Sequence, residues 1–281
     1  MVRIITDSAA DFEPQELTRL GVTCIPLTVT FGDREYQENV SLTKDLFYEL
    51  LLSSEEMPKT AQASPQLLQD LFEAAKESGD EAVYLTLSSA LSGTYQTACM
   101  IRDLVDCDRC HVVDGKNATG GQRQLVEYAV RLRDAGKTAE EIIEGILSIR
   151  DRIVLYACVD TLEYLYRGGR ISHTAYAVGS LAQIKPIIRV SQEGTVEVPS
   201  KAIGMRKGMD LLCKRLEHDP PDEDFPFYVM YTNDRSVGET LARRFEAAGR
   251  PPIAEDHMIP VGAAIGSHVG PRACGFVYVR K

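Results

Sequence analysis

The chain has 281 residues, enough for one large domain or two medium-sized ones. Hydrophobic residues make up 44% and charged residues 26%, as in ordinary globular proteins. The net charge of −10 argues against a general surface for nucleic acids or anionic membranes. No apolar run approaches the roughly 18 residues of a membrane span. Because the acidic Asp7 comes too early for a signal peptide, we expect a cytoplasmic protein.

Strands and helices are expected to alternate over the first 150 residues. The expected elements are a strand at 2–6, a helix at 12–20 ended by Gly21, a strand at 22–31 turning at Gly32-Asp33 into a small hairpin, a helix at 42–52, a helix from Pro65, strands at 82–87 and 111–114, and helices at 122–135 and 139–150. This alternation is typical of a mainly parallel sheet with helices on both faces.

The pattern changes near Asp151. The expected elements are then a strand at 153–159, helices at 162–166 and 174–183, a hairpin of strands 187–190 and 195–198, a helix at 205–216, a strand at 227–231, a helix at 237–247, and short strands at 258–259 and 276–279. We therefore predict two α/β domains. Residues 1–150 form the first, and residues 151–281 form a second with a mixed sheet. The ligand site is expected between or beside them.

Seven cysteines are scattered along the chain, at positions 24, 99, 107, 110, 158, 213 and 274. An odd number of cysteines without an export signal indicates reduced thiols. Cys107 and Cys110 form a lone CxxC motif followed by His111. A metal or redox site would need a second ligand pair or a thioredoxin-like context, and neither is evident. We therefore expect a structural role for this motif.

The stretch Ser88–Thr97 follows the expected strand at 82–87 and leads into a segment with apolar residues at helical spacing. In open parallel α/β sheets, ligands bind where strands end. The first N–H groups of a helix lack partners within it, and the helix dipole favours negative charge there. With Gly93 and the hydroxyls of Ser92 and Thr94, the stretch predicts a site for a carboxylate or phosphate. An equally good interpretation is that Ser92 or Thr94 only caps the helix.

A second polar stretch, Lys59–Pro65, precedes another segment with apolar residues at helical spacing. Ser64 followed by Pro65 predicts the start of that helix, with proline at its first position. Thr60 and Gln62 lie just outside it, in an expected loop.

Together the two stretches resemble motifs of the DegV family of bacterial lipid-binding proteins. That family carries a TSQPS-like segment near residue 60 and an SSxLSGTYxxA-like segment near residue 90. Here the segments read TAQAS and SSALSGTYQTA. The first departs from the family pattern at Ala61 and Ala63, and the second matches closely.

The resemblance extends over nearly the whole chain. Further matching segments are TDSAAD at 6–11, LEYLYRGGRIS at 162–172, IKPII at 184–188 and GSHVGPRA at 266–273. Each motif is weak alone, but together they occur in the expected order and spacing. Arg272 stands where the family usually has glycine, a departure that we expect at the mouth of the pocket.

The resemblance implies that the chain binds a long-chain fatty acid, because the family positions matching Thr60 and Ser92 hydrogen-bond a fatty acid carboxylate. It further implies that the chain is a carrier and not an enzyme. A separate ATP-dependent fatty acid kinase would form the acyl phosphate, with ATP and magnesium as that partner's cofactors. The physical reason for hydroxyls is that a buried carboxylate protonates unless strong donors surround it. From the residues alone, an ordinary loop hydroxyl is the commoner role for a residue such as Thr60.

Arg170 and His268 are the next candidates. Arg170 follows two glycines, and its guanidinium suits an anion, although a surface salt bridge is the commoner role. His268 lies among several glycines, and a lone histidine is more often structural. The resemblance favours both as ligand-binding residues.

Weaker candidates share the same polar region. Ser89, Thr94 and Gln62 are expected in the polar cluster, and Asp7 orients a hydroxyl there or caps a helix. The basic pair Arg206-Lys207 is either a contribution to docking of the partner or a solvated helix end.

Two other functions remain open from the sequence. The chain is an acyl hydrolase or transferase if Ser92 is a nucleophile and His268 its base, but this needs an orienting acid and an oxyanion hole, and no GxSxG motif occurs. Alternatively, it binds some other small carboxylate or phosphate. Residues 262–266 do not form a Rossmann fingerprint, and no P-loop motif is present.

Overall fold

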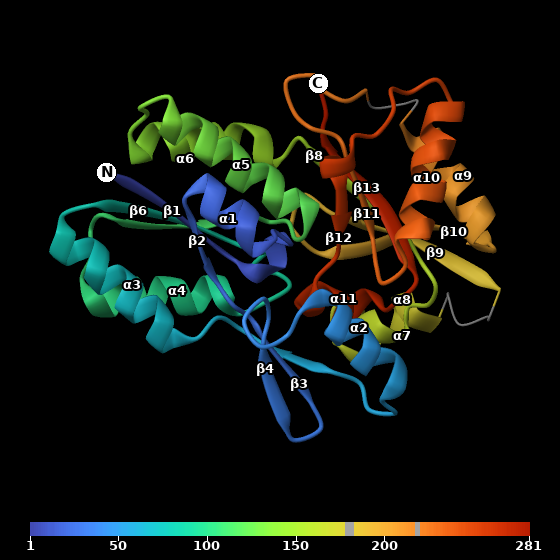
Figure 1. Ribbon diagram of the computed structural model, residues 1–281, viewed down its shortest axis with the longest axis horizontal. Helices are drawn as coiled ribbons and strands as arrows, with labels where there is room; N and C mark the ends of the chain where they lie inside the picture. The colour runs from blue at the N-terminus through green and yellow to red at the C-terminus, as the bar shows by residue number, and fades with distance from the viewer. Residues whose placement is uncertain (178–182, 217–219) are drawn as a thin grey trace.

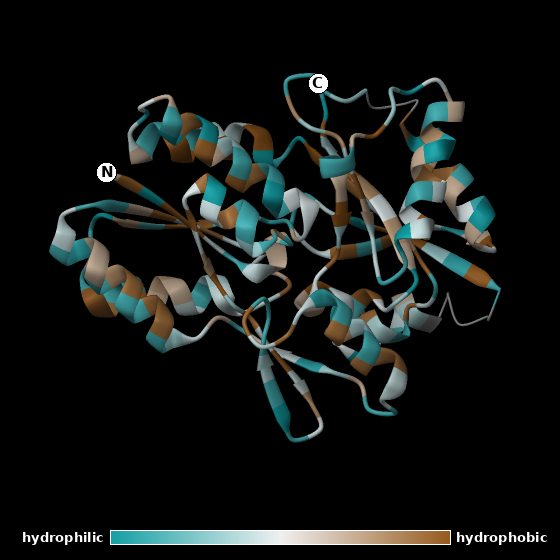
Figure 2. Ribbon diagram, viewed as in Figure 1, coloured by the Kyte–Doolittle hydropathy of each residue, from teal (hydrophilic) through white to brown (hydrophobic). Residues whose placement is uncertain are grey.

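The computed structural model describes residues 1–177, 183–216 and 220–281. Figure 1 shows two large sheets side by side, with a small three-stranded sheet at the lower edge of the molecule. No helix of the described residues is long and apolar enough to cross a membrane. Figure 2 shows the most hydrophobic segments along the strands of the two large sheets, and mixed colouring on the surface helices.

The first sheet has four parallel strands in the order β2-β1-β6-β7. The strands are β1 (Val2–Asp7), β2 (Val22–Ile25), β6 (Glu81–Thr86) and β7 (Cys110–Asp114). The parallel sheet with helices on both faces, expected from the alternation of elements, is confirmed. The helices of this part are α1 (Pro14–Leu20), α3 (Pro65–Ser78), α4 (Thr94–Val105), α5 (Gly120–Asp134) and α6 (Ala139–Arg150), with a short 3₁₀ helix η1 (Ser8–Ala10).

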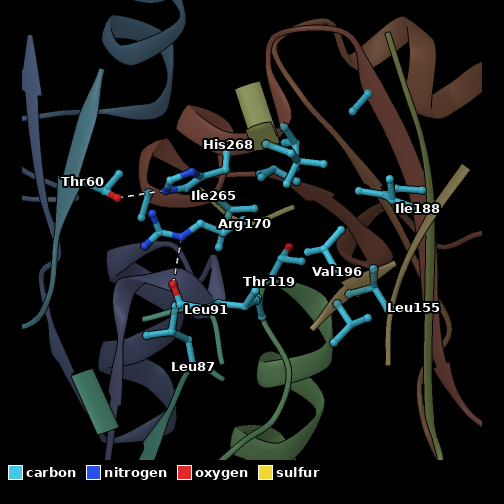
Figure 3. Close-up of a pocket in the computed structure, with 18 of the residues that line it drawn as sticks. Thr60, Leu87, Leu91, Thr119, Leu155, Arg170, Ile188, Val196, Ile265 and His268 are labelled. Carbon is cyan, nitrogen blue, oxygen red and sulfur yellow. Dashed lines mark hydrogen bonds between the residues drawn. The ribbon is translucent and has the colours of Figure 1, made fainter. Parts of the chain in front are cut away.

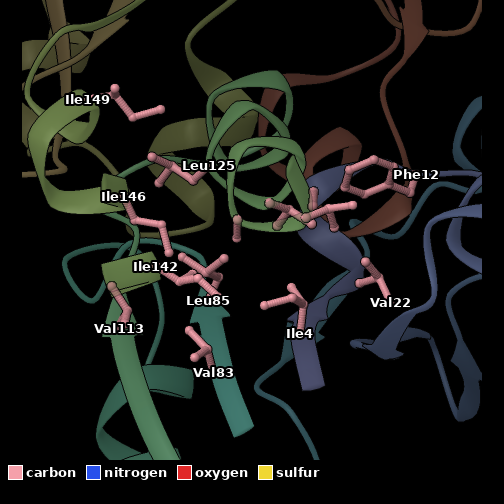
Figure 4. Packing of buried hydrophobic residues seen from close by; sticks show 14 of the residues in the cluster. Ile4, Phe12, Val22, Val83, Leu85, Val113, Leu125, Ile142, Ile146 and Ile149 are labelled. Atoms are coloured by element: carbon pink, nitrogen blue, oxygen red, sulfur yellow. The ribbon is translucent and has the colours of Figure 1, made fainter. Parts of the chain in front are cut away.

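Side chains of successive strand residues point to opposite faces of this sheet. Ile4 and Val83 pack with Leu125 of α5 and Ile142 of α6 on one face, which Figure 4 shows from close by. The next residues along the same strands pack on the other face, where α3 and α4 cover them. Because both faces are buried, the strands read as continuous apolar runs.

The second sheet has six strands in the order β10-β9-β8-β13-β11-β12. Its strands are β8 (Ile153–Val159), β9 (Ile184–Val190), β10 (Val196–Ile203), β11 (Tyr228–Tyr231), β12 (Met258–Pro260) and β13 (Ala273–Val279). Only the β11–β12 pair is parallel among the described strands of this sheet, so the expected mixed sheet is confirmed. Helices α9 (Met205–Arg215) and α10 (Arg235–Ala247) pack on one face. The predicted domain boundary at residue 150 stays a prediction.

The third sheet corrects two expectations. Its antiparallel strands are β3 (Thr28–Phe31), β4 (Arg34–Gln37) and β5 (Lys59–Ala61), in the order β4-β3-β5. The expected strand at 22–31 is in fact two strands in different sheets, because Pro26 interrupts it and cannot donate to a ladder. Thr60, expected in a loop, lies in β5 and pairs with Val29.

Short helices complete the fold. They are α2 (Lys44–Ser53), α7 (Glu163–Arg167), α8 (His173–Ala177), the 3₁₀ helix η2 (Glu255–His257) and α11 (Ala263–Val269). The expected helix at 174–183 is present as far as Ala177, and residues 178–182 lie outside the described part of the chain. Helix α11 was not expected from the sequence.

Several predicted helix ends are confirmed. Ser64 accepts a hydrogen bond from Leu67 and precedes Pro65, as expected for an N-cap. Thr138 and Glu141 form the expected capping box. Such contacts satisfy N–H groups that have no partner within the helix.

The expectation of seven reduced thiols is wrong for one pair, because Cys107 and Cys110 form a disulfide. The turn between α4 and β7 brings their Cα atoms to 5.3 Å, within the range that a disulfide spans. The other five cysteines are free.

Candidate ligand-binding site

A cavity of about 430 Å³ lies where the six-stranded sheet faces α11 and the loops after β6 and β7. Its volume is within the range of roughly 300–1,000 Å³ that is usual for small-molecule sites. Most of its wall is apolar. Among the described residues, the wall includes Leu27, Leu87, Leu155, Ile188, Val196, Met230 and Ile265. Leu155, Ile188, Val196 and Met230 lie in strands of the six-stranded sheet, whose register fixes their places in the wall.

One end of the cavity is polar. Polar residues on the cavity wall include Thr60, Gln62, Ser92, Arg170 and His268. Figure 3 shows Thr60, Arg170 and His268 gathered at one end, with Leu155, Ile188 and Val196 at the other. These polar residues come from strand β5 and the residue after it, the turn before α4, the loop after α7, and helix α11. Elements that lie far apart in the sequence therefore build this end of the cavity together.

Thr60 and His268 contact each other directly. The Thr60 hydroxyl lies 2.9 Å from Nε2 of His268, although the two residues are 208 positions apart. Burial, assisted by the positive charge of Arg170, lowers the pKa of His268 to about 4. The imidazole is therefore neutral at pH 7, with one nitrogen as donor and one as acceptor.

The other nitrogen of His268, Nδ1, is buried and has no hydrogen-bond partner among the described residues. The backbone of Gly168 packs against it. A Cβ atom at position 168 would lie 2.2 Å from Nδ1, so a side chain there would displace the ring. Gly168 therefore helps to fix where His268 stands at the polar end.

Arg170 lies beside this pair (Figure 3). Its Nε donates to the carbonyl of Leu91 at 2.9 Å, and another guanidinium nitrogen donates to the carbonyl of Gly168. No carboxylate within the described part of the chain forms an ion pair with Arg170, and burial lowers the pKa of its guanidinium. A partly buried cation without an anionic partner suits a negatively charged group of a ligand.

Ser92 both lines the cavity and contacts the start of α4. Its Oγ accepts from the backbone N–H of Thr94 at 3.2 Å and lies 3.0 Å from the Thr94 hydroxyl. Thr94 is fully buried and accepts from the backbone N–H of Ala63 at 3.3 Å. The N-cap residue of α4 is Gly93, so neither Ser92 nor Thr94 is the helix cap that the sequence suggested. Ser92 instead binds the first N–H of the helix and also lines the cavity.

Two weaker candidates lie elsewhere. Thr94 and Ser89 are not among the described residues that line the cavity. The Ser89 hydroxyl donates to the carboxylate of Asp114 instead. Asp7 accepts from the backbone N–H groups of Ala9 and Leu87, and so it caps the 3₁₀ helix η1.

The departures from the expected motifs can also be located. Ala61 is exposed and lines the cavity, whereas Ala63 is fully buried in the core beside α3. Arg272 is exposed and does not line the described cavity wall. Its φ is not positive, so the backbone at this position does not require glycine.

The sequence did not indicate most of the apolar wall. Leu155, Ile188 and Val196 lie in predicted strands, but nothing in their spacing distinguishes a cavity wall from a packed core. Leu27 follows Pro26, where the strand expected at 22–31 is interrupted, and Ile265 lies in α11, a helix that the sequence did not predict.

The contacts of Ser92 and His268 differ from those of a nucleophile–base pair. His268 contacts Thr60 rather than Ser92, and Ser92 contacts Thr94. Since the free nitrogen of His268 has no acidic partner among the described residues, the orienting acid of a catalytic triad has no counterpart there.

The fold and the cavity define an α/β protein with an internal site for an amphipathic small molecule, apolar along most of its length and polar at one end. A family model described as "Uncharacterised protein, DegV family" matches residues 1–281. The chain therefore belongs to the DegV family, which confirms the resemblance seen in its motifs.

Similar proteins cover the chain from end to end. It is 32% identical over 282 residues to a DegV domain-containing protein of Caldanaerobacter subterraneus subsp. tengcongensis, covering 100% of this chain and 99% of the relative. It is also similar to a DegV family protein from Thermus thermophilus whose structure describes fatty acid binding, with 27% identity, a TM-score of 0.88, and coverage of 100% and 99%. A stearic acid-binding protein from Eubacterium ventriosum matches with 25% identity, a TM-score of 0.89, and the same coverage.

Proposed function

We propose that this chain binds a long-chain fatty acid in its cavity, with the carboxylate held by Thr60 and Ser92, and that it presents the acid to a separate ATP-dependent fatty acid kinase in the cytoplasm. The observation that carries the proposal is the form of the cavity, which is apolar along its length and ends in hydroxyls and a cation. Fatty acid binding by the Thermus thermophilus and Eubacterium ventriosum proteins supports the choice of ligand.

The apolar wall supplies the affinity in this proposal. Each methylene group removed from water contributes about 0.8 kcal/mol. A long acyl chain therefore gains far more from the wall than the head group gains from any single hydrogen bond, whose net value is about 1 kcal/mol. The polar end then sets the direction in which the acid lies.

The polar end suits a carboxylate because it offers donors and, among the described residues, no competing anion. The hydroxyls of Thr60 and Ser92 are neutral donors, and Arg170 adds a positive charge without an anionic partner in the described chain. Neutral His268 and exposed Gln62 add further polar atoms at the same end. Ser89 and Thr94 are left out of the direct contacts, because their hydroxyls are engaged away from the cavity.

Phosphoryl transfer belongs to the partner in this proposal. The sequence offers no P-loop, and the motif resemblance points to a carrier subunit. We also propose the division of the chain at residue 150. The last strand of the first sheet ends at Asp114 and the first strand of the second begins at Ile153, with α5 and α6 between them.

The first test is mass spectrometry of organic extracts from the purified protein and from a Thr60→Ala/Ser92→Ala variant. We expect near-stoichiometric long-chain fatty acid in the wild type and much less in the variant. A matched control is Thr18→Ala/Ser148→Ala, which also removes one threonine and one serine hydroxyl, but from exposed positions on α1 and α6. The control should retain its lipid. A wild type that neither carries nor takes up fatty acid would refute the proposal.

The kinase step needs a separate measurement. With a candidate fatty acid kinase from the same organism, ATP and magnesium, acyl phosphate should form only when the loaded chain is present. Turnover of an activated ester by the chain alone, lost in Ser92→Ala, would instead favour the hydrolase or transferase. Loss of lipid without any ester turnover is what a binding protein predicts.

A further inference from the structure

Two buried carboxylates lie at the start of helix α11, the helix that carries His268. Asp11 follows η1, and Glu38 follows β4, so both come from the N-terminal part of the chain. Each is about 1% exposed. Neither lines the cavity within the described wall, so the proposed ligand contacts leave their burial unexplained.

Both carboxylates accept hydrogen bonds from the first turn of α11. Asp11 Oδ1 accepts from the backbone N–H of Gly262 at 2.8 Å, and Glu38 Oε1 accepts from that of Ala264 at 3.2 Å. These N–H groups have no partner within the helix, so the two side chains supply the acceptors that a helix start requires. The partial positive charge of the helix start also favours anions there.

Glu38 is itself held in place. Its second oxygen, Oε2, accepts from the hydroxyl of Ser8 at 2.6 Å, and Ser8 Oγ accepts from the backbone N–H of Leu27 at 2.9 Å. Leu27 lines the cavity. The carboxylate therefore links the start of α11 to the segment that joins the first sheet to the small sheet.

The contact also requires glycine at the helix start. A Cβ atom at position 262 would lie 2.3 Å from Glu38 Oε1 and 2.9 Å from Asp11 Oδ1. The hydroxyl of Tyr48 adds a third hydrogen bond to this segment, because it donates to the carbonyl of Val261 at 2.9 Å. Three side chains thus anchor residues 261–264, one turn before His268.

The charges around this anchor are mixed. Asp7 faces the two carboxyls from the end of β1, Cys24 from β2, Lys44 and Tyr48 from α2, and Arg123 from α5. Burial raises the pKa of Glu38 to about 7 and that of Asp11 to about 6. Keeping two such carboxyls buried is costly for folding, which indicates a specific purpose for their position.

We propose that Glu38 and Asp11 are positioning residues for His268. By fixing the start of α11, they determine where the imidazole meets Thr60 and, if the proposed function holds, where it meets the head group of the ligand. Glu38 acts on His268 through its hydrogen bond with Ala264, which lies one helical turn before His268 in α11.

The test measures His268 itself, in lipid-free protein. Long-range ¹H–¹⁵N NMR spectra across a pH titration report the pKa and tautomer of each histidine, and a His268→Gln variant assigns the signal. In the wild type, His268 should titrate near its lowered pKa of about 4. In Glu38→Ala, the ring should lose part of its burial, and its pKa should rise by about one unit, a tenfold change in proton affinity.

Two further variants distinguish a specific effect on the position of His268 from a general loss of stability. Glu38→Gln keeps an amide oxygen for the Ala264 N–H and should leave the His268 pKa near that of the wild type. Glu38→Asp keeps the charge but withdraws the carboxylate by one methylene, so it should raise the pKa as Glu38→Ala does, even if the alanine variant does not fold. The matched control Glu246→Ala removes an exposed glutamate from α10.

An unchanged His268 pKa in folded Glu38→Ala or Glu38→Asp would overturn the inference, whatever happens to stability. So would a Glu38→Gln variant that behaves like Glu38→Ala. Because the measurement uses lipid-free protein, its outcome is independent of whether the chain binds fatty acid. Fatty acid retention, measured on the same variants, then reports on the proposed function separately.

Discussion

The buried carboxyl of Glu38 makes the stability of the fold depend on pH. Burial, with the nearby charge of Asp11, raises the pKa of Glu38 from 4.5 to about 7 in the folded chain. A group whose pKa is raised by folding stabilises the fold below its unfolded pKa, and this contribution is lost as the pH rises through the folded pKa. Glu38 therefore favours the folded state at pH 5 and no longer does so at pH 8.

The magnitude follows from the two pKa values. With 4.5 in the unfolded chain and about 7 in the folded chain, the contribution of Glu38 falls by roughly 2.5 kcal/mol between pH 5 and pH 8. Glu38→Gln stays neutral throughout and lacks this loss. The difference in unfolding free energy between variant and wild type should therefore shift by that amount in favour of the variant as the pH rises.

Urea unfolding followed by far-UV circular dichroism at pH 5, 6, 7 and 8 measures this shift, and the absence of tryptophan makes dichroism the better signal. Asp7 and Asp11 titrate in both proteins, so their direct contributions largely cancel in the difference. Glu246→Gln serves as the exposed control. If wild type and Glu38→Gln lose stability in parallel from pH 5 to pH 8, the reasoning about Glu38 is refuted.

Three further outcomes are expected. Arg123→Met leaves Glu16 and Glu127 without their shared cation and should lower the unfolding free energy by about 3 kcal/mol in urea; a loss below 1 kcal/mol would contradict this. Ala157→Leu fills part of the cavity wall and should shift the lipid found by mass spectrometry toward shorter chains, whereas an unchanged profile would contradict the placement of the acyl chain. Thr138→Ala removes half of a capping box and should lower the unfolding free energy by about 1 kcal/mol, with no change in bound lipid.

Local patterns in the sequence were sufficient for much of the fold. Strand β6 and helix α4 follow from an apolar run and from helical spacing, and Ser64 or Thr138 mark helix starts by their own side-chain contacts. In each case the interaction that forms the element lies within a few residues of it. The two large sheets could therefore be predicted in outline.

Elements that depend on distant partners were harder to predict. Strand β5, with Thr60, exists because it pairs with β3 about 30 residues earlier, and no local pattern in Lys59–Ala61 predicts that pairing. Helix α11 is seven residues long and contains a glycine, so isolated helix formation is unfavourable. Its start is supported by Glu38 and Asp11, more than 220 positions away in the sequence.

The candidate site likewise has a part that the sequence predicted and a part that it did not. Thr60, Ser92, Arg170 and His268 were recognised through motif resemblance, and all four line one cavity, with Thr60, Arg170 and His268 at one end of it. The apolar wall was not recognised, because a residue such as Leu155 has the same sequence pattern whether it faces a cavity or a packed core. Only the arrangement of the sheets around the cavity distinguishes the two.

Buried polar groups in this chain have two roles, lining the cavity or binding backbone N–H groups, and the buried acidic side chains have only the second among the described residues. No acidic side chain lines the described cavity wall, whereas Asp7, Asp11 and Glu38 are buried outside it and contact backbone N–H groups. A carboxylate inside the cavity would repel an anionic head group, but one at a helix start stabilises the backbone that carries the site. Burial, together with the positive charge of Arg170, lowers the pKa of His268, so the polar end holds one positive charge and one neutral ring instead of two repelling cations. Such an end can hold a single carboxylate in its ionised form, because one cation balances its charge and neutral donors complete its hydrogen bonds.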